Sequence, residues 1–293
     1  MSSVALPTAA TLPPRRSAIF EFCRQQPLGA ASFVIIFAMM FAGIFAEYVS
    51  PYNPLDIDFA GILSAPSWQH WGGTDAFGRD IFSRIIYGSR TALTVGLGAS
   101  LLGATLGSLI GVASAYFGGR TDLVVQRVMD VFFAFPVIIL ALAVVAVLGT
   151  GAGNVILAIA APMIPRCARV VRASALAVRE MPYVDAARAA GFGHARIILR
   201  HMLPNVMAPI LIMATAFLGE AILLEASLSF IGLGVQEPTA AWGLMLRGAA
   251  VEFAETAPWM AIFPGLAISL AVFGFNLLGD SLRDALDPRL RTQ

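Results

Sequence analysis

The sequence contains no lysine, because all 19 of its basic residues are arginine. It therefore has no lysine to hold ATP phosphates in a Walker A loop and none to form a Schiff base. Cysteine is also scarce, since two residues are too few for a metal cage, and no His-Glu-x-x-His pattern occurs. We therefore expect no catalytic group, no metal and no cofactor in this chain itself.

Charge is scarce as well. Only 13% of the 293 residues are charged, 58% are hydrophobic, and the net charge is +1. Soluble domains carry about 25% charged residues, so membrane lipid is the solvent that suits this composition. The small net charge gives no indication of a nucleic-acid partner.

Several apolar stretches are long enough to span a bilayer, which requires about 20 residues. The third stretch (128–149) and the fourth (154–176) are separated only by residues 149–153 and should form a tight hairpin. The predicted fold class is all-α, a polytopic membrane protein with six transmembrane helices. The stretches are 28–48, 91–116, 128–149, 154–176, 206–232 and 259–281.

The remaining segments divide the chain further. Residues 1–27 contain prolines without a hydrophobic period and predict a flexible N-terminus. Residues 49–90 are predicted to be an external segment, and 282–293 a cytoplasmic tail. Residues 91–281 form a five-helix core that includes a cytoplasmic loop, 177–205. Four apolar residues of the external segment predict a short helix on the membrane surface: Ile81, Phe82, Ile85 and Ile86.

The arginines are distributed unevenly across this topology. If the N-terminus is cytoplasmic, fifteen arginines, including the seven from Arg166 to Arg200, lie inside and four lie outside. An excess of arginine is typical of the cytoplasmic side. The same orientation places all four tryptophans at the external face, where their rings suit the headgroup layer. We therefore predict that both termini are cytoplasmic.

Small residues recur at every fourth position of the second stretch and so share one helix face. Such a face lets a second helix approach closely. We interpret it as a packing surface, with a face that lines a pathway as the alternative. The residues are Ala99, Gly103, Gly107, Gly111 and Ala115.

The loop after the fourth stretch has the pattern of a short helix. Pro182 suits a first helical turn, Asp185 lies near the positive end, Arg188 lies near the negative end, and Gly191 can end the helix in the left-handed conformation. A helix from about 182 to 190 is predicted. Its alanines would make it slim enough to enter a groove of a partner.

A second helix is predicted to follow Gly193 and to run to Leu203, because Pro204 disfavours helical geometry at the residue before it. The loop would then comprise a helix, a glycine hinge and a second helix. The alternative is a basic loop that only lies at the headgroups.

This loop resembles that of the permease subunits of ATP-binding-cassette importers. Their pattern is Glu-Ala-Ala, three residues, Gly, nine residues, Ile, one residue and Leu-Pro. The spacing is matched by Asp185, Ala186, Ala187, Gly191, Leu203 and Pro204. Asp185 stands where Glu is usual, and His201 stands where Ile is usual. The resemblance implies that the loop forms a coupling helix, which inserts into a separate ATPase subunit and transmits its motion.

Three further runs, 73–90, 225–234 and 275–289, resemble the permeases of peptide and nickel importers. The matches cover most of residues 51–290 and look most like the C-type permease of a dipeptide or oligopeptide system. The resemblance implies the type I importer permease fold in a bacterial inner membrane. It also implies a second homologous permease, ATP-binding subunits that hold ATP and magnesium, and an extracytoplasmic substrate-binding protein as partners.

Three polar residues within the spans are candidates for the translocation pathway: Glu220, Glu225 and Asn276. Charge inside a bilayer is costly and usually faces a cavity or a partner. For Glu220, the alternative to a place in the pathway is bonding to another helix. For Glu225, the alternative is a position near the external surface, where water hydrates the carboxylate.

The sequence therefore predicts a transport subunit without its own ATPase site, forming half of a peptide pathway. A nickel or glutathione importer would use the same scaffold. An ion-driven secondary transporter would need an internal repeat and paired broken helices, which the sequence does not display. A membrane metalloprotease would need grouped histidines, whereas His70 is distant in the sequence from His194 and His201.

Overall fold

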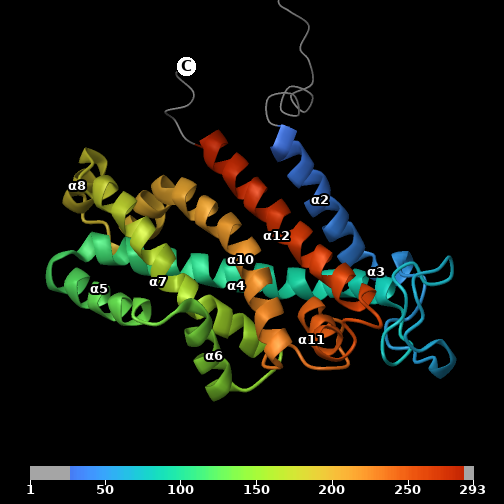
Figure 1. Cartoon of the computed structure of the whole chain (residues 1–293). Helices are drawn as coiled ribbons and strands as arrows, with labels where there is room; N and C mark the ends of the chain where they lie inside the picture. The colour runs from blue at the N-terminus through green and yellow to red at the C-terminus, as the bar shows by residue number, and fades with distance from the viewer. Residues whose placement is uncertain (1–26, 287–293) are drawn as a thin grey trace, which may run out of the picture.

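The computed structural model describes residues 27–286, except for the side chains of 249–251 and 285–286. The flexible segment predicted before residue 27 and the tail beyond residue 286 lie outside the described residues. Within them the fold is all-α, without a sheet (Figure 1). The longer helices are α2 (Pro27–Ile44), α4 (Ile81–Phe117), α5 (Gly119–Phe133), α6 (Val137–Leu148), α7 (Ala152–Arg179), α8 (Pro182–Ala189), α10 (Met207–Ile231), α11 (Trp242–Glu252) and α12 (Trp259–Leu286).

Five helical stretches of the described chain are long and apolar enough to cross a membrane. They are α2, α4, α7, the run His194–Ile231 and α12. The predicted span 128–149 is instead shared by α5 and α6, which meet at an angle of 93°. Pro136 explains the bend, because it precedes α6 and disfavours helical geometry at Phe135. The all-α class is confirmed, with a sixth span only if this bent pair crosses as one.

The second span begins ten residues earlier than predicted, so the separate surface helix at 81–86 is wrong. These residues form the first turns of α4, a single helix of 37 residues. The Asp80 side chain caps it by accepting a hydrogen bond of 2.7 Å from the Ser83 amide. Ile81 and Ile86 are buried in the protein and do not lie against lipid.

The stripe of small residues on α4 is a packing surface, as predicted. It lies along α7, and a Cβ placed on Gly107 would be 2.6 Å from Cβ of Cys167 and 2.7 Å from the carbonyl oxygen of Ile164. A Cβ on Gly103 would similarly meet the side chain of Met163 at 2.8 Å. The two helices can therefore approach this closely only because the stripe lacks side chains.

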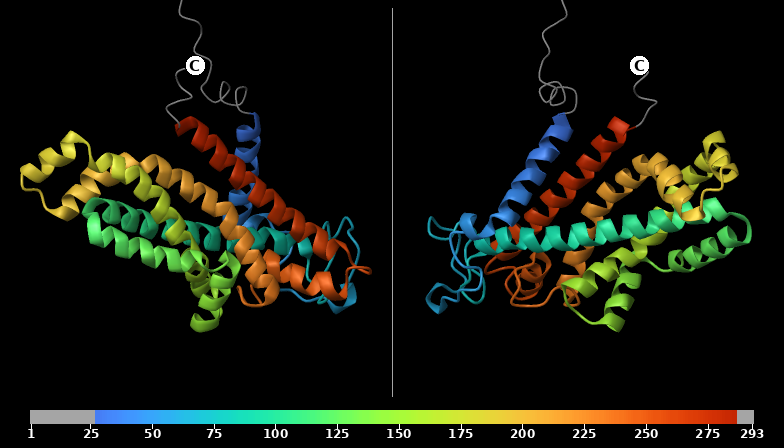
Figure 2. Two further views of the ribbon diagram at one scale, coloured as in Figure 1. Left: turned by 60° about the vertical axis from the view of Figure 1, so that its left-hand side comes forward. Right: turned by 180° about the vertical axis from the view of Figure 1, so that it is seen from behind.

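The other helices pack around this central pair. α10 lies against α4, α7 and α12, whereas α2 lies against α4 and α12, and α11 fits between α10 and α12. Figure 2 shows α8 and the segment that precedes α4 at opposite ends of α4. Figure 1 shows that α2 begins and α12 ends on one side of the molecule. The fold thus separates two regions that carry polar chemistry, one at each end of α4.

Candidate functional site

The first region is the loop that contains α8, and the predicted helix is confirmed. Pro182 occupies the first turn, and Nη1 of Arg188 pairs with Oδ1 of Asp185 at 3.0 Å. Gly191 has a φ of 75° and ends the helix in the left-handed conformation. Its amide donates to the carbonyl of Arg188 at 3.0 Å, and the amide of Phe192 donates to that of Ala187 at 3.1 Å. This pair of bonds is a Schellman motif, which fixes where the helix ends.

The two faces of α8 differ in what they contact. Val184 and Ala187 are buried against the rest of the chain, with exposures of 0% and 5%. Asp185, Ala186 and Ala189 are exposed. Of the two adjacent motif alanines, only Ala186 is therefore available to a partner, because Ala187 belongs to the chain's own core.

The predicted break before Pro204 is wrong. Leu203 has helical angles, φ −56° and ψ −44°, and the path continues from α9 (His194–Arg196) through a π turn (Ile197–Met202) and a 3₁₀ turn (Leu203–Val206) into α10. Pro204 lies at the start of the 3₁₀ turn, where its missing N–H needs no helical partner. The loop is thus joined to α10 by continuous helical backbone.

His201, which replaces the usual Ile of the pattern, makes an aromatic stacking contact within the loop. Its ring stacks on that of Phe192, with centroids 5.7 Å apart and planes at 21°. Phe192 follows directly after Gly191, so this contact holds the π turn against the end of α8. The residue that departs from the pattern therefore makes an aromatic contact within this chain.

The loop is also attached to the end of α4. The hydroxyl of Tyr116 lies 2.8 Å from Nδ1 of His194, and the guanidinium of Arg188 lies 5.1 Å from the centre of the Tyr116 ring. Nη1 of Arg179 donates to the carbonyl of Ala115 at 3.0 Å. Tyr116 was not among the predicted site residues, since an aromatic residue at a helix end gives no distinctive signal in one sequence.

Three arginines that were assigned to the cytoplasmic side lie within α7, which continues to Arg179. Each pairs with a carboxylate on a helix other than α7. The pairs are Arg166 with Glu220, Arg169 with Asp130 at 2.7 Å, and Arg172 with Asp122, where Nε lies 2.6 Å from Oδ1. They therefore tie α7 to its neighbours and contribute less to the charge of the loop than the sequence suggested.

The pair formed by Arg166 and Glu220 lies near the middle of two membrane-spanning helices. Nη1 of Arg166 donates to both carboxylate oxygens of Glu220, at 2.6 Å to Oε2. The interhelical role considered for Glu220 is thus confirmed. The side chains of Arg166 and Glu220 remain 38% and 28% exposed, and the amide of Asn276 lies against the neighbouring Gly219. Asn276 therefore lies beside the residue that precedes Glu220 in α10.

Glu225 is separate from them and does not lie in water at the surface. Its exposure is 1%, and one carboxylate oxygen accepts a hydrogen bond of 2.6 Å from the hydroxyl of Ser229. The alternative of a hydrated external carboxylate is therefore wrong. Burial within this chain also keeps Glu225 away from any solute in this conformation.

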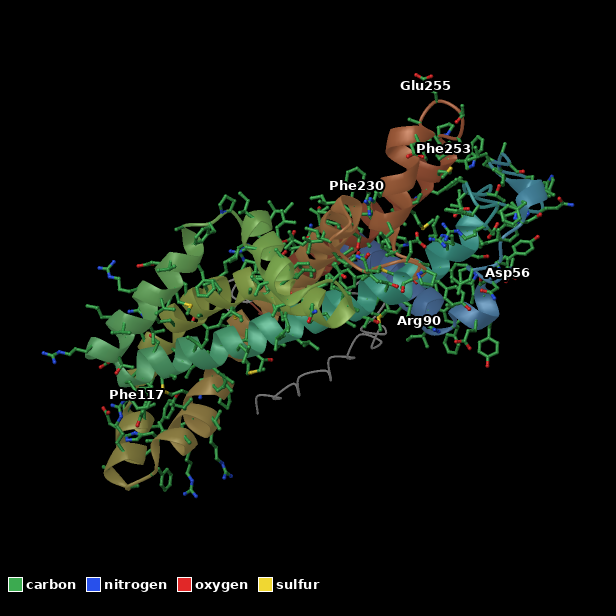
Figure 3. All side chains as sticks on the ribbon, turned by 90° about the horizontal axis from the view of Figure 1, so that it is seen from below. Asp56, Arg90, Phe117, Phe230, Phe253 and Glu255 are labelled. Atoms are coloured by element: carbon green, nitrogen blue, oxygen red, sulfur yellow. The ribbon has the colours of Figure 1, made fainter. Side chains whose placement is uncertain are left out.

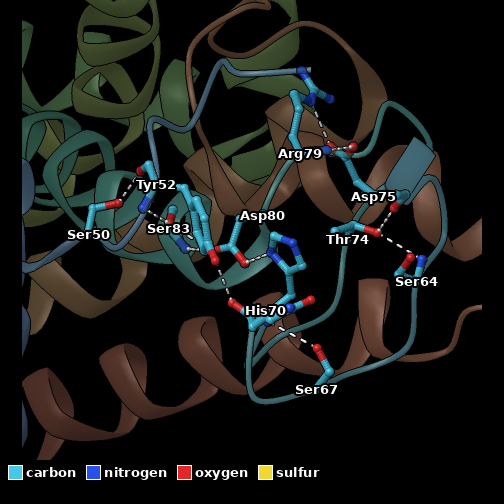
Figure 4. Close-up of polar contacts among 12 residues, drawn as sticks. Ser50, Tyr52, Ser64, Ser67, His70, Thr74, Asp75, Arg79, Asp80 and Ser83 are labelled. Atoms are coloured by element: carbon cyan, nitrogen blue, oxygen red, sulfur yellow. Dashed lines mark hydrogen bonds and ion pairs between the residues drawn. The ribbon is translucent and has the colours of Figure 1, made fainter. Parts of the chain in front are cut away.

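The second region lies at the other end of α4 and is built on the segment before Ile81 (Figure 4). Asp75 pairs with Nε of Arg79 at 2.7 Å. Oδ1 of Asp80 lies 2.9 Å from Nδ1 of His70. The hydroxyl of Thr74 accepts from the Ser64 amide at 2.8 Å. This network folds the segment over the beginning of α4.

Two of the four tryptophans hold the same region together. Trp242 is 3% exposed, and its ring N–H donates to the carbonyl of Ile85 at 3.0 Å. The ring N–H of Trp259 donates to the carbonyl of Thr74 at 3.3 Å. The prediction that all four tryptophans lie in the headgroup layer is thus wrong for Trp242, whereas Trp68 and Trp71 are exposed.

Comparison with known proteins finds one family and several relatives that match this chain. The family described as binding-protein-dependent transport system inner membrane component matches residues 103–292. The chain is 41% identical over 273 residues to the dipeptide transport system permease protein DppC of Alkalihalophilus pseudofirmus, covering 93% of this chain and 90% of that protein. It is 43% identical over 269 residues to the glutathione transport system permease protein GsiD of Escherichia coli, covering 92% and 88%. A relative from Brucella suis is 40% identical over the whole length of both chains.

Proposed function

Because the chain belongs to the family of binding-protein-dependent transport system inner membrane components, we propose that it forms half of the translocation pathway for short peptides. It is a multi-pass membrane protein and a permease subunit of an ATP-binding-cassette importer. Relatives named for dipeptide and glutathione transport support a peptide as the solute, since glutathione is itself a small peptide. Glutathione is thus the second candidate solute.

The proposed partners are a second homologous permease, ATP-binding subunits and an extracytoplasmic substrate-binding protein. ATP hydrolysis belongs to the ATP-binding subunits, and this chain supplies no ATPase site. The α8 loop and both termini face the cytoplasm of a bacterial cell, whereas the segment before α4 faces outward. The excess of arginine near α8 supports this orientation, because it follows the positive-inside pattern.

The exposed face of α8 is the observation that carries the coupling proposal. Its small side chains, Ala186 and Ala189, allow a close approach to an ATPase subunit, and the Schellman motif at Gly191 fixes the helix end. Movement of α8 would reach α4 through Tyr116 and reach α10 through the continuous helical turns. The core would then alternate between outward and inward access as ATP is bound and hydrolysed by the partner.

Uptake by the reconstituted importer tests the proposed solute. Proteoliposomes that contain both permeases, the ATPase subunits and ATP should accumulate labelled alanyl-alanine when the binding protein is added outside. Glutathione and Ni²⁺ are added as competitors in parallel experiments. Uptake that is inhibited by Ni²⁺ alone, or that proceeds without ATP, would contradict the proposal.

The pair formed by Arg166 and Glu220 gives a test of the pathway. Glu220→Gln leaves a half-buried arginine uncompensated within the membrane, and we expect a loss of about 1–3 kcal/mol in stability, measured by thermal unfolding in detergent. Arg166→Gln should have a similar effect, and the double variant should recover most of it. If the pair also lines the pathway, the stable double variant will still transport poorly.

Full uptake by the double variant would show that the pair acts only between helices. Asn276→Ala tests another pathway candidate separately, because Asn276 lies beside Gly219 and is not charged. Equal loss of stability in the double and single variants would contradict the assignment of a stabilising pair.

A further inference from the structure

A cavity of about 440 Å³ lies at the end of the molecule that we assign to the external side. It is lined by the segment around Asp75, the beginning of α4, and α11, with Met260 of α12 contributing to its wall. Figure 3 shows Phe253, another lining residue, at this end of the chain. Sites for small molecules usually have volumes of about 300–1,000 Å³, so a short peptide would fit.

Arg84 lines this cavity, and not all hydrogen-bond donors of its guanidinium group have a partner. Its side chain is 1% exposed, and its one hydrogen bond is from Nη1 to the carbonyl of Pro54 at 3.3 Å. Nε has no hydrogen-bond partner among the described residues. Oδ2 of Asp75 lies 3.8 Å from Nε, and Oε1 of Glu237 lies 3.6 Å from Nη2, both beyond hydrogen-bond distance. A buried guanidinium with spare donors is a site for an acceptor.

Two residues of α11 complete the cavity with opposite charges. Arg247 and Glu252 both line it, both are exposed, and neither forms an ion pair with any residue in the described range. Asp75 differs from them, because it is already paired with Arg79 at 2.7 Å. The cavity therefore combines donors for a carboxylate with a carboxylate of its own that lacks a cation.

We propose that this cavity binds a short peptide as a zwitterion. Arg84 and Arg247 would hold its terminal carboxylate, and Glu252 would hold its terminal ammonium group. The apolar wall formed by Leu244, Phe253 and Met260 would accept small side chains. The inference rests on the proposed peptide solute and adds a binding site in the permease itself, distinct from the pair in the middle of α7 and α10.

Direct binding without the substrate-binding protein tests this site. Alanyl-alanine is titrated calorimetrically into the complete importer in nanodiscs, where saturable binding is expected. Alanyl-alanine amide, which lacks the carboxylate, should bind about tenfold more weakly. Arg247→Gln and Glu252→Gln, both at exposed positions, should each weaken alanyl-alanine binding by about tenfold. Arg84→Gln should weaken it further if that variant folds.

Arg90→Gln is the matched control, because Arg90 lies on α4 at the same end and does not line the cavity. Its binding should equal that of the wild type. The inference is overturned if alanyl-alanine does not bind, or if binding is the same in the Arg247 and Glu252 variants as in the wild type. Uptake with the binding protein is measured on the same samples, so that intact uptake without binding rejects only this site, and absent peptide uptake rejects the proposed solute.

Discussion

Ala186→Arg is expected to prevent the ATPase subunits from co-purifying with the permease and to abolish ATP-dependent uptake. Ala186 lies on the exposed face of α8, opposite the buried Val184 and Ala187. An arginine there would place an unpaired charge and a long side chain in the proposed interface, at a cost of about 3 kcal/mol or more. Such a cost weakens association by about a hundredfold.

Two controls separate docking from folding. Ala186→Ser keeps the side chain small and should preserve assembly, whereas Ala254→Arg introduces the same charge at an exposed alanine of the opposite end and should also preserve it. Ala187→Arg is unsuitable as a test, because that side chain is 5% exposed and packs within the chain. Normal recovery of ATPase subunits with Ala186→Arg would show that α8 is not the docking element.

Local chemistry in the sequence was sufficient to predict α8. Its first-turn proline, its two charges and its terminal glycine act within a few residues of one another, so no distant contact was needed. Gly191 therefore has the predicted left-handed conformation. The same local reasoning failed at Leu203, where the π turn before it changes the hydrogen-bond register and makes Pro204 compatible with a helical path.

Contacts between distant segments were beyond a single sequence. The pairing of Arg166 with Glu220 joins residues 54 positions apart, and the distribution of arginines assigned Arg166 to the cytoplasmic side because it treats each charge as unpaired. Burial of Arg84 was missed for the same reason. Sequence patterns thus predicted five of the six spans and the small-residue face, whereas the polar partners depended on how the helices pack.

Gly107→Leu is expected to prevent stable folding of the permease. At this position α4 approaches the backbone of α7, since a Cβ would lie 2.7 Å from the carbonyl oxygen of Ile164. A backbone atom cannot move aside as a flexible side chain can, so leucine must force the two helices apart. We expect a loss of about 3 kcal/mol, at the upper end of the cost of overpacking, measured as a lower unfolding temperature and aggregation during size-exclusion chromatography.

Gly265→Leu is the matched control within another membrane-spanning helix. A Cβ on Gly265 would meet no atom within 4 Å, and leucine favours helical backbone by about 1 kcal/mol relative to glycine. This variant should therefore fold as well as the wild type, although it carries the same substitution. If both leucine variants unfold at the same temperature, close approach at Gly107 is not what holds α4 against α7. If only Gly107→Leu fails, the stripe of small residues on α4 is the contact on which packing of α4 against α7 depends.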